Sequence, residues 1–282
     1  MNRKIVFLDI DGTLSNENRV PESAKRACRA ARKNGHILYI CTGRARLQIS
    51  AAIVRVGFDG LVSSGGAYVE TMENGGKVLF EASIEREKLR ALTSYFNGRR
   101  AAYMLELTDR LVAGPYLRAH AAKYLTWRPF TLSHLRERQF LRRAVFTKCK
   151  WNNYSLDRGA VRKVTFWDSG SLTFEDVARE FGDGLDLTRL SIPVAGMIGG
   201  EIGPYGVHKG SALERVSAYH GFERADTIAF GDSDNDRAMI QRAGLGVAMG
   251  NADPSLKAIA GDVADSVEND GLAKAFKKYG LV

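Results

Sequence analysis

Hydrophobic residues along this chain form short runs that alternate with stretches of helical spacing. Apolar runs cover residues 4–8, 36–41 and 60–63, and each stops at a polar residue or a turn. Over residues 21–34 the apolar positions instead recur at the spacing of a helix face, with Pro at the start and Gly after the end. We expect strands at the three runs, a helix between the first two, and a second helix that runs through Val56.

The second half of the chain repeats this pattern. It predicts a helix over residues 209–221, a strand over 226–230, and strand–helix units at 245–248 and 263–267. Short, almost continuously apolar strands that alternate with helices are typical of a parallel sheet covered on both faces. The sequence therefore predicts an α/β fold with a doubly wound, Rossmann-like parallel sheet.

The charge of the chain is concentrated in its middle. The 282 residues carry 41 Lys and Arg and 32 Asp and Glu, a net charge of +9. Residues 83–189 hold 20 basic and 12 acidic side chains, whereas residues 1–82 hold 12 and 8, and residues 190–282 hold 9 and 12. This local excess predicts an inserted domain at 83–189 between two parts of one catalytic core, 1–82 and 190–282.

The insertion has elements of its own. Its pattern predicts helices over 83–96 and 172–181, strands over 144–150 and 162–168, and a strand pair or hairpin over 101–112. The glycine-rich residues 191–202 are expected to return to the core through a strand pair. We therefore expect an inserted α/β domain.

Composition excludes several classes of protein. A hydrophobic fraction of 45% with 26% charged residues is typical of a globular chain. The apolar runs are far shorter than the ~20 residues of a membrane-spanning helix, and Asp9 and Asp11 interrupt the N-terminal run, which argues against a signal peptide. Cys28, Cys41 and Cys149 are widely and irregularly spaced, as in reduced proteins. We expect a cytoplasmic protein.

Polar groups follow three of the predicted strands. The first strand runs into Asp9 and Asp11, the second into Thr42, and a later one into residues 231–236, Gly-Asp-Ser-Asp-Asn-Asp. The carboxyl ends of parallel strands meet at one edge of a sheet, so we expect these groups to converge with Lys209, which begins a helix. Taken singly, each has a commoner explanation as a cap, a turn residue or a solvated side chain. Their joint occurrence in these places favours one site.

Such a set of side chains suits phosphoryl transfer. Clustered carboxylates repel one another unless a hard cation lies between them, which predicts Mg²⁺ with oxygen ligands. One aspartate of the Asp9 and Asp11 pair can attack as a nucleophile while the other shuttles a proton. Thr42 and Lys209 can supply a hydrogen bond and a positive charge to a bound anion.

The motifs resemble those of a known family. Residues 7–14, Phe-Leu-Asp-Ile-Asp-Gly-Thr-Leu, are similar to the first motif (DxDGT) of the haloacid-dehalogenase-like (HAD) phosphatases. Thr42 resembles the second motif, Lys209 the third, and residues 231–236 the fourth, GDxxND. Residues 246–252 and 269–272 resemble the Cof-type (class IIB) subgroup, in which a large α/β cap is inserted between the third core strand and the lysine motif.

The resemblance implies a role for each matching residue. Asp9 would be the nucleophile that forms an aspartyl-phosphate, and Asp11 would protonate the leaving alkoxide and then activate water. The ligands of Mg²⁺ would be Asp9, the backbone carbonyl of Asp11, and Asp232. Asp236 would orient Lys209 or a metal-bound water. The phosphate oxygens would be met by Thr42, the amides of Ile10 and Gly43, Lys209 and Asn235.

Two positions depart from the pattern of the subgroup. The third strand ends in Gly65-Gly66-Ala67 in place of Asn-Gly-Ala, and His208 precedes the motif lysine where a small residue is usual. Neither touches the chemistry, but either could alter closure of the cap or substrate preference.

The sequence thus predicts a Mg²⁺-dependent phosphomonoester hydrolase that acts on a small phosphorylated metabolite, such as a sugar phosphate. A phosphohexomutase, with the same aspartate pair and a similar cap, is the alternative enzyme. A basic nucleic-acid-binding protein is a third reading, which rests on the net charge alone because no nucleic-acid-binding motif is evident. We expect neither a nucleic acid nor a membrane as a partner. The oligomeric state stays open.

A basic cluster in the insertion comprises Arg136, Arg138, Arg142 and Arg143. Charge runs usually form a solvated face. The alternative is a docking surface for an anionic substrate.

Overall fold

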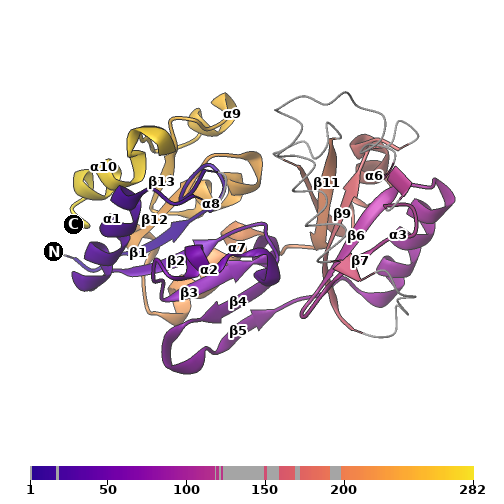
Figure 1. The fold of residues 1–282 in the computed structure, drawn as a ribbon, viewed down its shortest axis with the longest axis horizontal. Coiled ribbons are helices and arrows are strands. Elements are labelled where there is room, and N and C mark those ends of the chain that lie inside the picture. The colour runs from indigo at the N-terminus through magenta and orange to yellow at the C-terminus, as the bar shows by residue number, and fades with distance from the viewer. Residues whose placement is uncertain are drawn as a thin grey trace. The chain divides into compact units, whose positions relative to one another are not determined.

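The computed structural model describes residues 2–16, 19–117, 119–120, 122, 149–150, 159–168, 172–190 and 198–282. Contacts between Cα atoms divide the chain into two compact units (Figure 1). The first unit joins Met1–Glu81 with Val207–Val282, and the second is Ala82–Gly206. Each unit has its own sheet.

The sheet of the first unit has eight strands in the order β14-β13-β12-β1-β2-β3-β4-β5. The six strands from β14 to β3 are parallel, whereas β4 and β5 are antiparallel. The sequence predicted the parallel part but not this antiparallel edge, which folds back through a turn at residues 64–66. The strands are β1 (Ile5–Leu8), β2 (Ile37–Cys41), β3 (Gly60–Ser63), β4 (Tyr68–Thr71), β5 (Val78–Glu81), β12 (Thr227–Gly231), β13 (Leu245–Ala248) and β14 (Asp262–Val263).

Helices cover both faces of this sheet, as the apolar runs predicted. Val6 and Leu8 of β1 pack in one core with Ala27 of α1. Ile5 and Phe7, which alternate with them, pack in a second core. The first core also takes residues of α2 and α10, and the second takes residues of α7, α8 and α9. The helices are α1 (Glu22–Lys33), α2 (Ala51–Val54), α7 (Lys209–Tyr219), α8 (Arg237–Arg242), α9 (Pro254–Lys257) and α10 (Gly271–Lys278).

The second unit is built on an antiparallel sheet of six strands in the order β10-β11-β9-β6-β7-β8. Its pairs are antiparallel except for β7 with β8. Residues of α3 and α6 pack with the strands in a third hydrophobic core. The elements are α3 (Arg86–Gly98), β6 (Ala102–Leu107), β7 (Leu111–Ala113), β8 (Cys149–Lys150), β9 (Val161–Trp167), α6 (Phe174–Phe181), β10 (Leu185–Arg189) and β11 (Gly199–Pro204).

Residues 191–202 were expected to return to the core through a strand pair, and the described part of this segment, residues 198–202, belongs to the second unit. Strand β11 pairs with β9 and β10 in the sheet of the second unit, so the chain leaves that unit after Gly206 rather than at residue 190. Glycine is required here by packing. A Cβ on Gly199 would lie 2.1 Å from the carbonyl oxygen of Phe166, and one on Gly200 would lie 2.7 Å from the Phe166 ring.

Among the described residues, no helix is both long enough and apolar enough to cross a membrane. The basic cluster at residues 136–143 lies outside the described residues, as does most of the strand expected over 144–150.

Candidate active site

Three strands of the first unit end in polar residues at the same edge of the sheet. β1 pairs in parallel with both β2 and β12, with Leu8 opposite Ile40 and Phe230. The residues that follow these strands are Asp9, Thr42 and Asp232. The parallel register therefore delivers all three to one edge, as the sequence predicted.

A tight turn after β1 shapes the first motif. The amide of Asp9 donates to the carbonyl of Phe230 at 3.1 Å, which extends the β1–β12 pairing by one residue. The chain then turns at Gly12, where φ is +82°, and the amide of Ser15 bonds back to the carbonyl of Ile10 at 2.8 Å. A Cβ on Gly12 would lie 2.3 Å from the Asp232 carboxylate. Glycine is thus needed both for the positive φ and for the close approach of the two loops.

Lys209, the first residue of α7, is buried among oxygen atoms. Its Nζ donates to Oδ1 of Asp9 at 2.7 Å, to Oδ1 of Asn235 at 2.9 Å and to Oδ1 of Asp236 at 2.7 Å. The side chain of Lys209 is 1% exposed, and those of Asp9 and Asp236 are 6% and 0% exposed. One ammonium group therefore joins residues that lie about 200 positions apart in the sequence.

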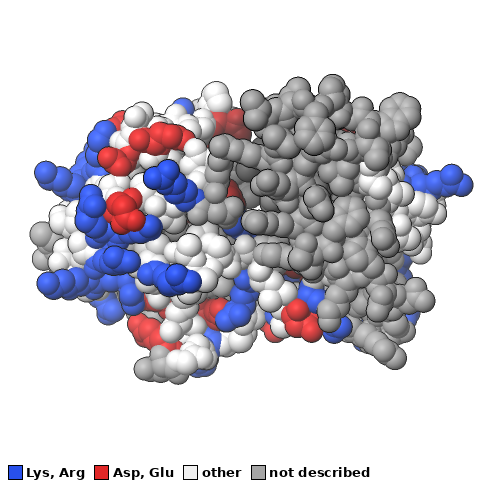
Figure 2. All heavy atoms as spheres, in the orientation of Figure 1, with Lys and Arg blue, Asp and Glu red and all other residues white. Residues whose placement is uncertain are grey.

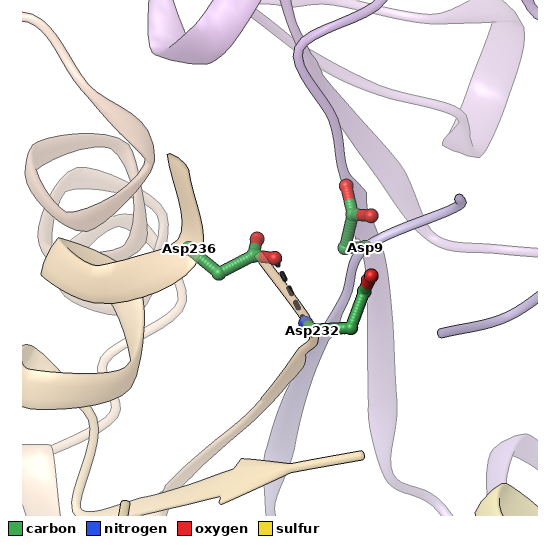
Figure 3. A group of neighbouring side chains, drawn as sticks. All are labelled: Asp9, Asp232 and Asp236. Atoms are coloured by element: carbon green, nitrogen blue, oxygen red, sulfur yellow. Dashed lines mark hydrogen bonds between the residues drawn. The ribbon is translucent and has the colours of Figure 1, made fainter. Parts of the chain in front are cut away.

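Asp9, Asp232 and Asp236 form a cluster of carboxylates (Figure 3). Each offers an oxygen, and these three oxygens lie within 4.8 Å of one another. Oδ2 of Asp236 accepts from the backbone amides of Asp232 at 3.0 Å and of Ser233 at 3.2 Å. Because Lys209 holds its other oxygen, Asp236 has both oxygens engaged. Asp9 and Asp232 are therefore better placed than Asp236 to bind a metal ion.

Burial and crowding shift the protonation equilibria of the cluster. Burial raises the pKa of Asp9 well above its usual value; the Lys209 ammonium opposes this shift and the Asp236 and Asp232 carboxylates add to it. The pKa of Asp232 is raised to about 7, first by burial and then by Asp236, while a hydrogen bond from Thr13 opposes the rise. Burial alone would lower the pKa of Lys209, but Asp236 and Asp9 outweigh it and raise that pKa.

This donor set fits a divalent cation. Burial, with the neighbouring carboxylates, raises the pKa of Asp9 and of Asp232, so positive charge beside these groups would favour their ionised forms. A hard cation bound by carboxylate oxygens would supply that charge. The oxygen donors present here are the kind Mg²⁺ prefers.

The other predicted site residues lie in the loops that follow β1 and β2. Thr42 is buried at the end of β2, and its hydroxyl accepts from the Arg44 amide at 3.2 Å. Gly43 follows Thr42 in the same loop. The carbonyl of Ile10 accepts from the amide and the hydroxyl of Ser15. These contacts order the loops without by themselves joining Thr42, Ile10 or Gly43 to the carboxylates.

Three further residues contact the site, and the sequence reasoning gave them no role. The Thr13 hydroxyl donates to Oδ1 of Asp232 at 3.0 Å. Asn251 donates to the carbonyl of Gly12 at 2.8 Å, which ties the first motif to the C-terminal part of the core. Arg44 forms an ion pair with Asp11. Thr13 and Asn251 lie inside motifs recognised in the sequence, so their positions could have marked them as site residues. For Arg44 the only such signal was its position two residues after Thr42.

His208, which stands where the subgroup usually has a small residue, has a local structural role. His208 caps the N-terminus of α7, because its Nδ1 accepts from the amide of Ser211 at 3.2 Å and its own amide donates to the Ser211 hydroxyl at 3.1 Å. The cap therefore fixes the start of the helix on which Lys209 stands.

Comparison with known proteins agrees with this geometry. A family model for haloacid dehalogenase-like hydrolases matches residues 6–276. YkrA of Bacillus subtilis (strain 168) is 26% identical, with 100% of each chain covered. The 5-amino-6-(5-phospho-D-ribitylamino)uracil phosphatase YcsE of the same bacterium is 23% identical, with 99% of this chain and 96% of YcsE covered. The structure of the HAD subclass IIB sugar phosphatase BT4131 has the same fold, with a TM-score of 0.78 at 23% identity and with 99% of this chain and 100% of that chain covered.

The chain belongs to the haloacid dehalogenase-like hydrolases. Within that family it is a HAD-type phosphatase of the Cof-type subclass, IIB, and its second sheet is the insert typical of that subclass. The family and the fold class predicted from the sequence are confirmed.

Proposed function

We propose that this protein is a Mg²⁺-dependent phosphomonoester hydrolase that works through an aspartyl-phosphate on Asp9. The observation that carries the proposal is the buried contact of Lys209 with Asp9, Asn235 and Asp236. A buried ammonium ion beside clustered carboxylates can bring a nucleophile and an anionic phosphoryl group together, because it offsets the charge of both.

In the proposed reaction, Asp9 attacks the phosphorus atom and forms an O–P bond while the bond to the leaving oxygen breaks. Asp11 gives its proton to that oxygen. Water then attacks the phosphorus of the phosphoenzyme, Asp11 takes a proton from the water, and release of inorganic phosphate restores Asp9.

The remaining residues are proposed to bind the metal ion and the phosphate group. We propose that Asp9, Asp232 and the backbone carbonyl of Asp11 hold Mg²⁺, which when bound would supply positive charge to the phosphoryl oxygens. Asn235 turns its carbonyl oxygen to Lys209, so its NH₂ group is the end that can donate to a phosphate oxygen. The Thr42 hydroxyl and the amides of Ile10 and Gly43 are proposed as the other phosphate donors.

The names of two relatives and the polar site together support a proposal for the substrate class. The names of YcsE and BT4131 give a phosphorylated ribitylaminouracil and a sugar phosphate as what those proteins act on. Both are alkyl phosphates with polar leaving groups. We propose a substrate of this kind, and residues 82–206 as the unit that selects it.

The test is phosphate release by the purified protein from p-nitrophenyl phosphate in the presence of Mg²⁺. Loss of a catalytic nucleophile removes most of the rate, so Asp9→Asn should lower kcat by about 10³-fold or more. The matched control is Asp234→Asn, which makes the same change at an exposed residue of the fourth motif and should retain activity.

Retained activity in Asp9→Asn would contradict the proposed mechanism. A phosphomutase would behave differently from either outcome, because it would convert one hexose phosphate into another without releasing phosphate.

A further inference from the structure

Thr13 lies in the turn after β1 and contacts Asp232, which follows β12. Its hydroxyl donates to Oδ1 of Asp232 at 3.0 Å, and Thr13 is only 1% exposed. Because β1 and β12 are parallel neighbours, the sheet brings both loops to the edge where the carboxylates cluster. A buried hydroxyl thus binds one oxygen of a residue proposed to hold the metal ion.

The backbone of Asp232 is held on both sides. Its amide donates to Oδ2 of Asp236 at 3.0 Å, and its carbonyl accepts from the amide of Asp253 at 3.0 Å. These contacts fix the main chain, so the direction of the carboxylate depends on the side-chain torsions of Asp232. The hydrogen bond from Thr13 restricts those torsions.

The two carboxylate oxygens of Asp232 have different surroundings. Oδ1 accepts from Thr13, whereas Oδ2 accepts no hydrogen bond from the residues that the structure describes. Gly12, the residue before Thr13, lies close to Oδ2, because a Cβ there would be 2.3 Å from that oxygen. The same turn therefore occupies one oxygen and, by having glycine, leaves room beside the other.

Mg²⁺ and Ca²⁺ differ in how they bind a carboxylate. Ca²⁺ is larger, takes more oxygen ligands and often binds both oxygens of one carboxylate, whereas Mg²⁺ requires a compact octahedral set. Binding through both oxygens of Asp232 would turn Oδ1 toward the ion and weaken its hydrogen bond with Thr13. Binding through Oδ2 alone would keep that hydrogen bond.

We propose that Thr13 is a positioning residue that makes Asp232 a one-oxygen ligand and so favours Mg²⁺ over Ca²⁺. This inference rests on the proposed function, because it takes Asp232 to be a ligand of the metal ion. Thr13 acts through Asp232 and need not touch the ion. The hydroxyl of the side chain, rather than its volume, is the part that sets the preference.

The experiment measures the affinity of the full chain for Mg²⁺ and for Ca²⁺ separately. Each affinity is taken from the rise in Tm with increasing MgCl₂ or CaCl₂, at one pH and without substrate. Thr13→Val removes the hydroxyl at nearly the same side-chain volume. It should weaken Mg²⁺ binding about tenfold and Ca²⁺ binding much less, because loss of a group that orients a metal ligand costs affinity for the ion it was oriented for. Thr13→Ser keeps the hydroxyl and should restore the ratio of the two affinities.

The ratio of the two affinities separates positioning from other effects. A change in the charge of Asp232 alters the binding of both divalent cations alike, and so does a general loosening of the site. The matched control is Ser15→Ala, which removes a buried hydroxyl from the same turn, where it donates to the carbonyl of Ile10 at 3.2 Å. That variant should leave the ratio unchanged.

Equal losses for both cations in Thr13→Val, or a ratio that Thr13→Ser does not restore, would overturn the inference and give Thr13 only a structural role. The same shift of the ratio in Ser15→Ala would overturn it too. Such results with an inactive Asp9→Asn protein would leave the proposed function standing. An unmodified protein that binds neither cation would instead contradict the proposed metal site, and the inference with it.

Discussion

At the turn after β3, two adjacent glycines carry different constraints. Gly65 has φ +67° and ψ +16°, the left-handed region that asparagine also adopts, and a Cβ there would meet nothing within 4 Å. Gly66 has φ +112°, and a Cβ there would lie 2.6 Å from the backbone oxygen of His208. The departure at Gly65 therefore keeps the backbone shape that Asn would give, while Gly66 is needed for packing against the start of α7.

We predict that Gly66→Ala lowers the free energy of unfolding by about 2 kcal/mol or more, because it adds both backbone strain and a clash with backbone atoms. Urea unfolding followed by circular dichroism measures the change. Gly65→Asn is the matched control and should stay within about 1 kcal/mol of the unmodified protein. Equal effects of the two substitutions would show that the contact with His208 does not matter.

At the scale of elements, the edge strand β14 is tied to the last helix. Asp262 of β14 accepts hydrogen bonds from Lys278 of α10 and from the hydroxyl of Tyr279 at 2.6 Å. Phe276 of the same helix is buried in the first core. A polar contact at the end of α10 thus supplements the apolar contacts that hold it to the sheet.

This contact makes a pH-dependent contribution to stability. The hydrogen bonds from Lys278 and Tyr279 lower the pKa of Asp262 to about 2. A carboxyl with a depressed folded-state pKa stabilises the fold above its unfolded value of about 3.9, and the effect is lost as pH falls through the folded value.

We predict that Asp262→Asn lowers the free energy of unfolding at pH 7 by at most about 1 kcal/mol, because the pair is partly exposed and screened by solvent. The difference between the two proteins should shrink as pH falls from about 4 toward about 2. Urea unfolding at several pH values measures it. A difference that grows on acidification would contradict the assigned sign.

At the scale of the whole molecule, the net charge belongs mainly to the second unit. With the boundaries that the structure gives, residues 82–206 carry 20 basic and 13 acidic side chains, and the first unit carries 21 and 19. Figure 2 shows Lys and Arg side chains interspersed with Asp and Glu on the face of the first unit that is in view. The charge of the chain therefore cannot be read as a property of the catalytic core.

We predict that neutralising four arginines of the second unit together raises KM for an anionic substrate several-fold at low ionic strength, and that added salt reduces the difference. The residues are Arg136, Arg138, Arg142 and Arg143. Steady-state kinetics at two salt concentrations measures the effect.

The control neutralises four basic residues that lie exposed on α1 and α10, namely Arg26, Arg29, Lys33 and Lys277. It removes the same number of charges from the first unit and should change KM less. Equal changes in both proteins would assign the effect to net charge alone, and unchanged kinetics would make the basic cluster a solvated surface.

The sequence by itself determined the parallel core and the family, and it predicted residues for the site. Apolar periodicity is local, so β1, α1 and β2 follow from it, and the rule that parallel strands end at one edge placed Asp9, Thr42 and Asp232 together. Only the tertiary structure decided which side chains bind one another. The Lys209 contacts and the Arg44–Asp11 pair depend on side-chain directions across loops, which spacing does not specify. The tertiary structure also assigned β11 to the second sheet, because strand pairing is a long-range interaction that the local pattern does not specify.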